Sequence, residues 1–294
     1  MNFRHLTYFL AVAEELHVGR AADRLGIAQP PLSRQIKQFE IELGVLLFHR
    51  GRSGISLTQA GQRLLERGNE IQRMVADSER EIRRIGQGME GRLRLGYVGS
   101  AVYGILPGIV KSFRANYPDV FLSMMPMNNA SLKQGLIRRE IDLAIARPDL
   151  RDGEIISRPL MMEPLALAAP DTVFPGRFAI SPEEVSGQLL ILYPEYPRPS
   201  FADIVLGCAK RHGISVDRTI FTMDVNTALG LVAVGEGVAI VPHSVSSSRM
   251  NGIRFHPFAT SIGETGLSIN HRIDDQSILV SNFVSIARTL VRKL

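Results

Sequence analysis

The segment from Gln29 to Lys37 carries polar side chains of the kinds that read base edges in DNA. The glutamine amide can form two hydrogen bonds with adenine, and the guanidinium of Arg34 can form two with guanine or clamp a phosphate. The paired prolines offer apolar surface to a thymine methyl group, and Lys37 suits a phosphate or solvent. The residues that we expect to face DNA in this segment are Gln29, Pro30, Pro31, Ser33, Arg34 and Lys37.

Two further arginines lie in a basic, glycine-rich segment, residues 49–54. We expect Arg50 and Arg52 to lie against the DNA backbone or in the minor groove, because a narrow A·T-rich groove attracts arginine. An alternative for Arg50 is an ion pair inside its own domain that braces the segment. The whole segment could also be an ordinary basic surface loop.

Short helices and a hairpin are predicted to position these side chains. Apolar residues recur at helical spacing in residues 3–16 and again in 29–43, and Gly26 suits the end of a helix between them. Apolar runs at 45–48 and 55–57 predict two strands on either side of the basic segment. The expected buried positions are Leu6, Phe9, Leu10, Ala13 and Leu16 in the first helix and Leu32, Ile36, Phe39 and Leu43 in the third. This order of elements is typical of a winged helix-turn-helix.

A long helix is predicted from a cap at Thr58 to about Ile85. Its positions at alternating steps of four and three form a heptad seam with two weak places. The seam consists of Leu64, Gly68, Ile71, Val75, Ser78, Ile82 and Ile85. We interpret the seam as a homodimer interface, since a two-fold dimer matches a two-fold DNA site. The alternative is that the helix packs against its own C-terminal domain.

The segment 86–91 matches the pattern G-x-G-x-x-G of dinucleotide-binding proteins by letter. That pattern requires a strand before it and a helix after it, whereas here a helix precedes and a strand is predicted to follow. We therefore interpret the segment as a hinge and expect no cofactor.

From residue 92 onward predicted strands alternate with predicted helices, which favours an α/β fold with mainly parallel sheets. The predicted strands are 93–98, 120–125, 141–146, 165–169, 189–192, 219–224, 238–241 and 267–271. The predicted helices are 102–116, 130–139, 200–212, 226–235 and 276–293.

Composition excludes several classes of protein. The 294 residues contain one cysteine, Cys208, so no disulfide can form within the chain. Neither a signal peptide nor a membrane-spanning run is predicted, and a cytoplasmic protein without membrane contact is expected. Motifs for hydrolases, zinc proteases and P-loop enzymes are lacking, and the seven histidines have no metal-like spacing, so we expect neither an enzyme nor a metal site. The net charge of +5 permits a nucleic-acid partner without requiring one.

The segments described above resemble the LysR family of transcription regulators. In residues 1–61 the resemblance is carried by FRHLTYFLAVAEE, AADRL, AQPPLSRQIKQFEIELG, LFHR and LTQAG. Further on it is carried by LGYVGS, IDLAIAR, RPSFAD and ALGLVAVGEGVAIVP, which are similar to the branch that controls aromatic degradation in response to benzoate or muconates.

The resemblance implies a DNA-binding domain at 1–58, a linker helix at 59–88 and an effector-binding domain at 92–294. The last would resemble periplasmic binding proteins, with lobe I at 92–162 and 268–294 and lobe II at 163–267. The family further implies a homotetramer, built as a dimer of dimers on double-stranded promoter DNA, with RNA polymerase as a candidate partner.

The cleft between the two lobes is expected to hold a small-molecule effector that is an anion. Ser100 follows the first strand of the domain, and Ser200 opens a helix on the other lobe; helix N-termini suit carboxylates. Two such termini facing one cleft would suit a muconate-like dicarboxylate or an aromatic acid. The alternative for Ser100 is an ordinary helix cap without a ligand, and capping would explain Asn226 equally well. The candidate effector residues are Ser100, Ala101, Asn128, Asn129, Pro199, Ser200, Phe201 and Asn226.

Two alternatives stay open at this stage. Arg147 and Glu163 match positions that form a second aromatic-acid pocket in some relatives, but a structural ion pair at the lobe boundary is the favoured interpretation. The chain could also be a constitutive DNA-binding regulator whose C-terminal domain serves only oligomerisation. That alternative predicts no change of the protein with any ligand.

Overall fold

The computed structural model describes residues 2–51 and 54–292, which form two compact units. The first unit comprises residues 1–83 and the second residues 84–294. Each unit is described by itself. No helix in the described ranges is long and apolar enough to cross a bilayer.

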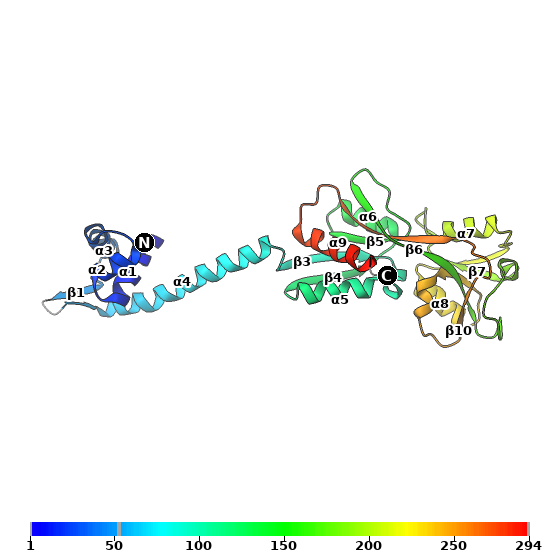
Figure 1. Cartoon of the computed structure of the whole chain (residues 1–294), viewed down its shortest axis with the longest axis horizontal. Helices are drawn as coiled ribbons and strands as arrows, with labels where there is room; N and C mark the ends of the chain where they lie inside the picture. Colours follow the sequence, from blue (N-terminus) through cyan, green and yellow to red (C-terminus); the bar gives the residue numbers. More distant parts are fainter. Residues whose placement is uncertain (1, 52–53, 293–294) are drawn as a thin grey trace. The chain divides into compact units, whose positions relative to one another are not determined.

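The short helices of the first unit lie close together (Figure 1), and their apolar side chains form a small core. Its elements are α1 (Phe3–Glu15), α2 (Val18–Leu25), α3 (Gln29–Leu43), β1 (Phe48–Gly51), β2 (Gly54–Leu57) and the start of α4 (Gln59–Gly86). Gly26 ends α2 with a φ of 67°, a left-handed conformation that costs glycine little. The predicted core residues are buried except Leu16 and Leu43, which are exposed because they stand at the last turn or the cap of their helices.

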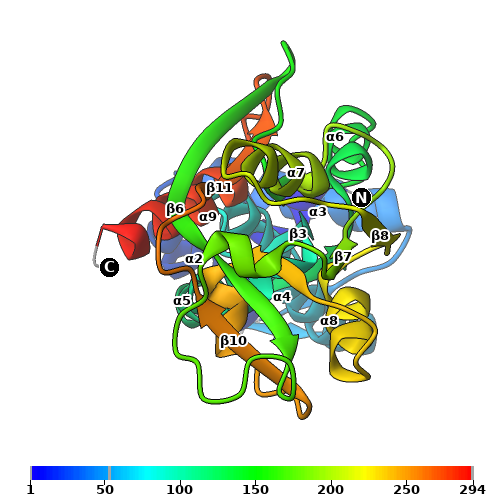
Figure 2. The same ribbon diagram turned by 90° about the vertical axis from the view of Figure 1, so that its right-hand side faces the viewer.

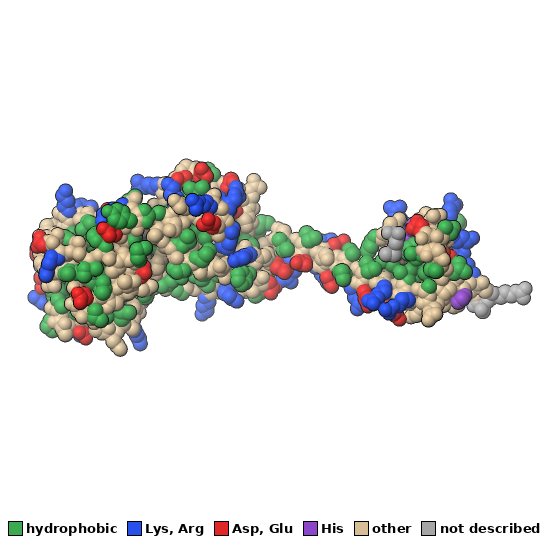
Figure 3. Space-filling view, turned by 180° about the vertical axis from the view of Figure 1, so that it is seen from behind, with side chains coloured by type: hydrophobic (Ala, Val, Ile, Leu, Met, Phe, Trp, Pro, Cys, Tyr) green, Lys and Arg blue, Asp and Glu red, His purple; other side chains and the backbone are tan. Residues whose placement is uncertain are grey.

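The helix α4 has two different environments along its length. Thr58 accepts a hydrogen bond from the Gly61 N–H at 3.0 Å, which confirms the predicted cap. Leu64 packs on the core of the first unit, and Gly68 is buried so closely that an added methyl group would lie 2.9 Å from Leu10. The seam residues from Ile71 onward are exposed, among the charged side chains that Figure 3 shows along this helix.

Lobe I of the second unit is a sheet covered by helices on both faces. Its elements are β3 (Gly91–Tyr97), the 3₁₀ turn η1 (Gly99–Tyr103), α5 (Leu106–Asn116), β4 (Val120–Pro126), α6 (Asn129–Ile137), β5 (Leu143–Ala146) and α9 (Ile278–Val291). The strand β3 runs parallel to β4 and β5. Side chains of β5 alternate between the core under α5 and α9 (Leu143, Ile145) and the core under α6 (Ala144, Ala146).

Two long antiparallel strands connect the lobes, β6 (Ile155–Pro170) and β11 (Glu264–Arg272). The first part of β6 pairs with β11, and its last part pairs with β10 (Ile253–Pro257). Figure 2 shows β6 as one long strand that extends past both β11 and β10. The core of lobe I includes Leu160 and Leu267, whereas Leu165 belongs to the core of lobe II.

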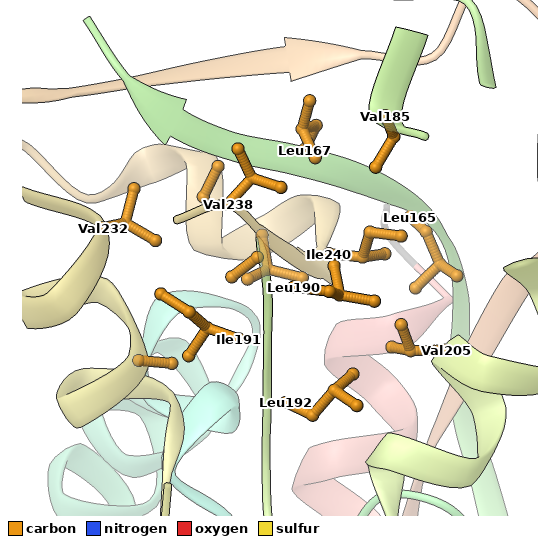
Figure 4. Close-up of a cluster of buried hydrophobic side chains, with 14 of the residues drawn as sticks. Leu165, Leu167, Val185, Leu190, Ile191, Leu192, Val205, Val232, Val238 and Ile240 are labelled. Atoms are coloured by element: carbon orange, nitrogen blue, oxygen red, sulfur yellow. The ribbon is translucent and has the colours of Figure 1, made fainter. Parts of the chain in front are cut away.

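Lobe II surrounds the largest apolar core of the unit, part of which Figure 4 shows. Its elements are the end of β6, the 3₁₀ turn η2 (Pro182–Val185), β7 (Leu189–Leu192), α7 (Phe201–Arg211), β8 (Arg218–Phe221), α8 (Val225–Ala233), β9 (Ala239–Pro242), the 3₁₀ turn η3 (His243–Ser247) and β10. The strands β7 and β8 are parallel. The buried branched side chains of β7 and β9 face α7 and α8, which explains the apolar runs in the sequence.

The structure corrects three sequence predictions. The sheets are mixed rather than mainly parallel, because β6, β9, β10 and β11 pair antiparallel. The sequence analysis did not predict the first two thirds of β6, whose strand pattern is obscured by Pro159 and Pro164. It also did not predict β10, which is only five residues long. The predicted helix 102–116 is a 3₁₀ turn followed by α5, because Pro107 has no N–H to donate and is tolerated in the first turn of a helix.

Candidate DNA-binding and effector sites

The N-terminal half of α3 presents the side chains that were predicted to read DNA. Gln29, Pro30, Arg34 and Lys37 are exposed and Ser33 is half-buried. The opposite face of α3 is anchored in the core by side chains at steps of four and three: Leu32, Ile36 and Phe39. No side-chain hydrogen bond caps the N-terminus of α3, but Pro30 and Pro31 have no N–H, so of the first three residues of the helix only Gln29 has a backbone N–H to offer to a phosphate.

The hairpin of β1 and β2, which we call the wing, is attached to α3 by a buried carboxylate. Glu40 is 7% exposed, and its Oε1 accepts hydrogen bonds from the N–H groups of Leu47 at 2.8 Å and Phe48 at 3.1 Å. Its Oε2 lies 3.5 Å from the Arg50 guanidinium, which is the contact that the bracing alternative requires. The Arg50 side chain is 40% exposed, so DNA contact by Arg50 stays a prediction. Arg52 lies outside the described residues. Sequence analysis missed Glu40, although its position four residues after Ile36 places it on the buried face of α3.

A cavity of about 510 Å³ lies between the lobes and collects most of the predicted effector residues. Those that line it are Ser100, Asn128, Asn129, Arg147, Ser200, Phe201 and Asn226. Ala101 is instead buried in the core of lobe I, and Pro199 lines a neighbouring cavity. The lining side chains follow β3, β4, β5, β7 and β8, so the cavity lies at the carboxyl ends of the parallel strands of both lobes.

On the side of lobe I, the lining residues differ in whether their polar side-chain atoms already form hydrogen bonds within the protein. Asn128 caps α6 by accepting from the Ser131 N–H at 2.9 Å. Asn129 donates to the Pro148 carbonyl at 2.8 Å and accepts from the Arg147 N–H at 3.3 Å, so it holds the loop after β5. Ser100 has no hydrogen-bond partner for its hydroxyl within the described ranges, which leaves it available to a ligand.

On the side of lobe II, the two helix N-termini already hold carboxylates of the protein. Ser200 donates its hydroxyl to the Pro194 carbonyl at 2.8 Å, and its N–H donates to Asp203 at 2.7 Å. Burial alone would raise the pKa of Asp203, but the Ser200 N–H and the Arg198 guanidinium together lower it. Asp224 likewise caps α8 by accepting from the Asn226 N–H at 2.8 Å. A second ligand carboxylate would therefore face an occupied terminus at α7.

A buried ion pair lies beside the cavity, and its arginine, Arg147, is one of the lining residues. Arg147 pairs with Glu163 and donates to the Thr265 carbonyl at 3.3 Å, and the Ser244 N–H donates to Glu163 at 2.6 Å. Burial lowers the pKa of Arg147, and the charge of Glu163 opposes that shift. Because Ser244 belongs to η3, the pair ties the end of β5 to lobe II, as expected of a structural ion pair.

Sequence analysis missed Tyr193, which lines the same cavity directly after β7. Its ring stacks on Phe201 with centroids 5.2 Å apart, and burial raises the pKa of its hydroxyl. Within the described ranges, neither the Tyr193 hydroxyl nor the Nε of Arg147 has a hydrogen-bond partner, although both atoms are buried. The rule that selected Ser100, a polar residue after a parallel strand, would also have found Tyr193.

Two family descriptions match this chain over nearly all of its length. Residues 3–62 match "Bacterial regulatory helix-turn-helix protein, lysR family" and residues 86–292 match "LysR substrate binding domain". The chain belongs to the LysR family. It is therefore a DNA-binding transcription regulator with an effector-binding domain, and its family is not one of enzymes.

Similar proteins of this family are known by sequence and by structure. The transcriptional regulator TfdS of Cupriavidus pinatubonensis (strain JMP 134 / LMG 1197) is 35% identical over 98% of both chains. Full-length CbnR, solved in complex with its target DNA, is 31% identical over 99% of this chain and 100% of that one, with a TM-score of 0.86. The effector-binding domain of BenM, solved with its effector benzoate, is 25% identical over 69% of this chain and 93% of that one, with a TM-score of 0.61.

Proposed function

We propose that this LysR-type regulator binds operator DNA through the N-terminal half of α3 and is switched by an aromatic acid or a muconate-like dicarboxylate. The proposal of an effector rests on one observation: residues of both lobes line a cavity at the carboxyl ends of the parallel strands. Benzoate is the effector of BenM, whose effector-binding domain resembles this one, and that supports the chemical class.

The geometry suggests how such an acid would lie. Its carboxylate would accept from Ser100, whose hydroxyl is unengaged within the described ranges, and its carbon skeleton would lie against Phe201. A polar group at the far end of the ligand would reach Tyr193 and the Nε of Arg147, two buried donors without partners in the described part of the chain. A buried donor without a partner is costly, so a ligand oxygen there would be stabilising.

The first test is thermal unfolding of the full-length protein with benzoate, cis,cis-muconate, chloromuconates and other aromatic acids. A ligand at 100 times its dissociation constant should stabilise the protein by about 2.7 kcal/mol. Ser100→Ala should lose most of that shift. The control is Ser112→Ala, on α5 and outside the cavity, which should keep it. If no acid shifts the transition, the effector class is wrong and the constitutive alternative gains support.

The second test concerns the DNA surface. Arg34→Ala should cost roughly 1–3 kcal/mol of specific operator binding and relax base preference at one position, if the guanidinium reads a base. Uniform weakening on all sequences would instead indicate a phosphate contact. The control is Arg24→Ala on α2, because the Arg24 guanidinium is already engaged by Glu14 of α1 at 2.6 Å. Unchanged affinity of the Arg34 variant at fixed salt would remove Arg34 from the interface.

The assembly belongs to the same proposal. The exposed part of the α4 seam supports a homodimer through this helix, and we infer a homotetramer on promoter DNA in the cytoplasm. RNA polymerase is the partner through which such a complex would act on transcription.

A further inference from the structure

A second cavity, of about 330 Å³, lies in lobe I and shares no lining residue with the effector cavity. The helix α9 and its C-terminal cap contribute Ser281, Ser285, Arg288 and Arg292 to its wall. These residues follow one another at steps of four, three and four, so they share one face of the helix. The sequence pattern alone gave no reason to single out that face.

The sheet contributes two more basic side chains to this cavity, Arg158 from β6 and His271 from β11. In the β-ladder Arg158 pairs with Ile269, and His271 stands two residues further along the same strand. Side chains two residues apart point to the same face of a sheet. Ile269 is buried in the core with Phe283 of α9, so the face concerned is the one that α9 covers.

The charges in this cavity are unbalanced. No acidic side chain lines it, and none of its three arginines has an ion-pair partner within residues 2–51 and 54–292. Elsewhere in the lobe, Arg94 pairs with Asp142 at 2.7 Å and Arg272 pairs with Asp275. Cations are favoured near the end of α9 by the helix dipole, but that does not account for Arg158 on the strand.

One ring nitrogen of His271 already forms a hydrogen bond within the protein. Its Nδ1 lies 2.9 Å from the carbonyl oxygen of Arg272 and must donate to it, because a carbonyl only accepts. That leaves the Nε2 of His271 for a ligand. With its proton on Nδ1, the ring can only accept at Nε2, for example from the O–H of a singly protonated phosphate. The donors that the cavity offers to a tetrahedral oxyanion are the guanidinium forks and the serine hydroxyls.

We propose that this cavity binds a small anion of the phosphate or sulfate class, at a site separate from the effector cleft. Its volume lies near the lower limit of small-molecule pockets, roughly 300–1,000 Å³, and so suits an inorganic anion or a small phosphate ester. Bound there, the anion would join α9 to β6 and β11, the two strands that connect the lobes.

The test uses the full-length protein in a chloride buffer of low ionic strength. Thermal unfolding and calorimetric titration are followed with inorganic phosphate, sulfate and 3-phosphoglycerate. The variants are Arg158→Gln with Arg288→Gln together, and Arg114→Gln as the control, since Arg114 is exposed on α5 and lies outside the cavity. Circular dichroism and operator binding check that each variant is folded.

Wild type and the Arg114 variant should bind one of these anions saturably, and the double variant should bind it roughly tenfold or more weakly, because hydrogen bonds to charged groups are lost. Preference for 3-phosphoglycerate over inorganic phosphate would identify an ester as the source. If the double variant fails to fold, Arg158→Lys and Arg288→Lys replace it; they keep the charge, lose the fork and should also weaken binding.

Three results would overturn the proposal. Equal binding by the double variant would place the anion elsewhere, for example at α3. No saturable binding of any of the three anions would leave the cavity without a ligand of this class. A shallower salt dependence of operator affinity in the double variant would show that these arginines contact DNA phosphates instead. None of these results bears on the effector proposal, which Ser100→Ala tests separately.

Discussion

Arg147 and Glu163 show how one residue pair can hold two lobes together. Each is less than 5% exposed, and their partners Thr265 and Ser244 come from β11 and η3. Two charges removed from water contribute little net stability as a pair, but a single buried charge without its partner is strongly unfavourable. Replacing one residue of the pair should therefore destabilise the interlobe contact more than replacing both.

Glu163→Leu should lower the free energy of unfolding of the effector unit by roughly 3–5 kcal/mol, because Arg147 keeps a buried charge. The double variant with Arg147→Met should lose clearly less. Urea unfolding followed by circular dichroism measures both. As a control, Arg139→Gln removes the exposed pair with Asp274 and should change stability by less than about 1 kcal/mol. Equal losses in the single and double variants would contradict this account.

At the level of elements, α4 is divided between two roles. Leu64 and Gly68, the first two positions of the predicted seam, pack on the first unit and are not free for a partner. From Ile71 onward the seam is exposed, with Ile82 at 69% and Ile85 at 50%. Apolar side chains aligned along an exposed helix favour a second copy of that helix, since burying them removes apolar surface from water.

Ile71→Glu with Ile82→Glu should therefore weaken the α4 dimer at least tenfold, because like charges replace apolar contacts in the seam. Sedimentation equilibrium measures the dimer dissociation constant directly. Ala76→Glu adds the same charge on an exposed position outside the seam and should leave the constant unchanged. A wild-type chain that stays monomeric at micromolar concentration would rule out dimerisation through α4.

On the scale of the whole molecule, the effector cavity draws its walls from both lobes, and β6 and β11 connect those lobes. A ligand can shift an equilibrium only if it binds one arrangement more tightly than another. A cavity lined by both lobes meets that condition, because any change in the relative position of the lobes changes the contacts that the ligand makes.

Linkage then sets a quantitative expectation for DNA binding. An effector that changes operator affinity by a given factor must have its own affinity changed by operator DNA by the same factor. Fluorescence anisotropy of labelled operator, with and without effector, gives one factor; calorimetric titration of effector, with and without operator, gives the other. Unequal factors would show that the measured ligand does not act through a simple two-site coupling. A factor of one in both would support a constitutive regulator.

The sequence by itself determined the local elements and the ends of strands. The helices of the first unit, the cap at Thr58 and the left-handed Gly26 follow from periodicity and turn chemistry within a few residues. Ser100 and Asn128 were found because each follows a predicted strand, and parallel strands bring their carboxyl ends to one edge. Arg147 was found through the resemblance to the LysR family.

Only the tertiary structure decided which distant groups meet. The pairing of Glu40 with the wing, the unpartnered hydroxyl of Tyr193 and the arginines around α9 depend on contacts between elements. Arg158 and Arg288 are 130 positions apart in the chain and share a cavity because α9 packs on β6 and β11. Periodicity reports which face of an element is buried, but the element that buries it is chosen by packing of the whole chain.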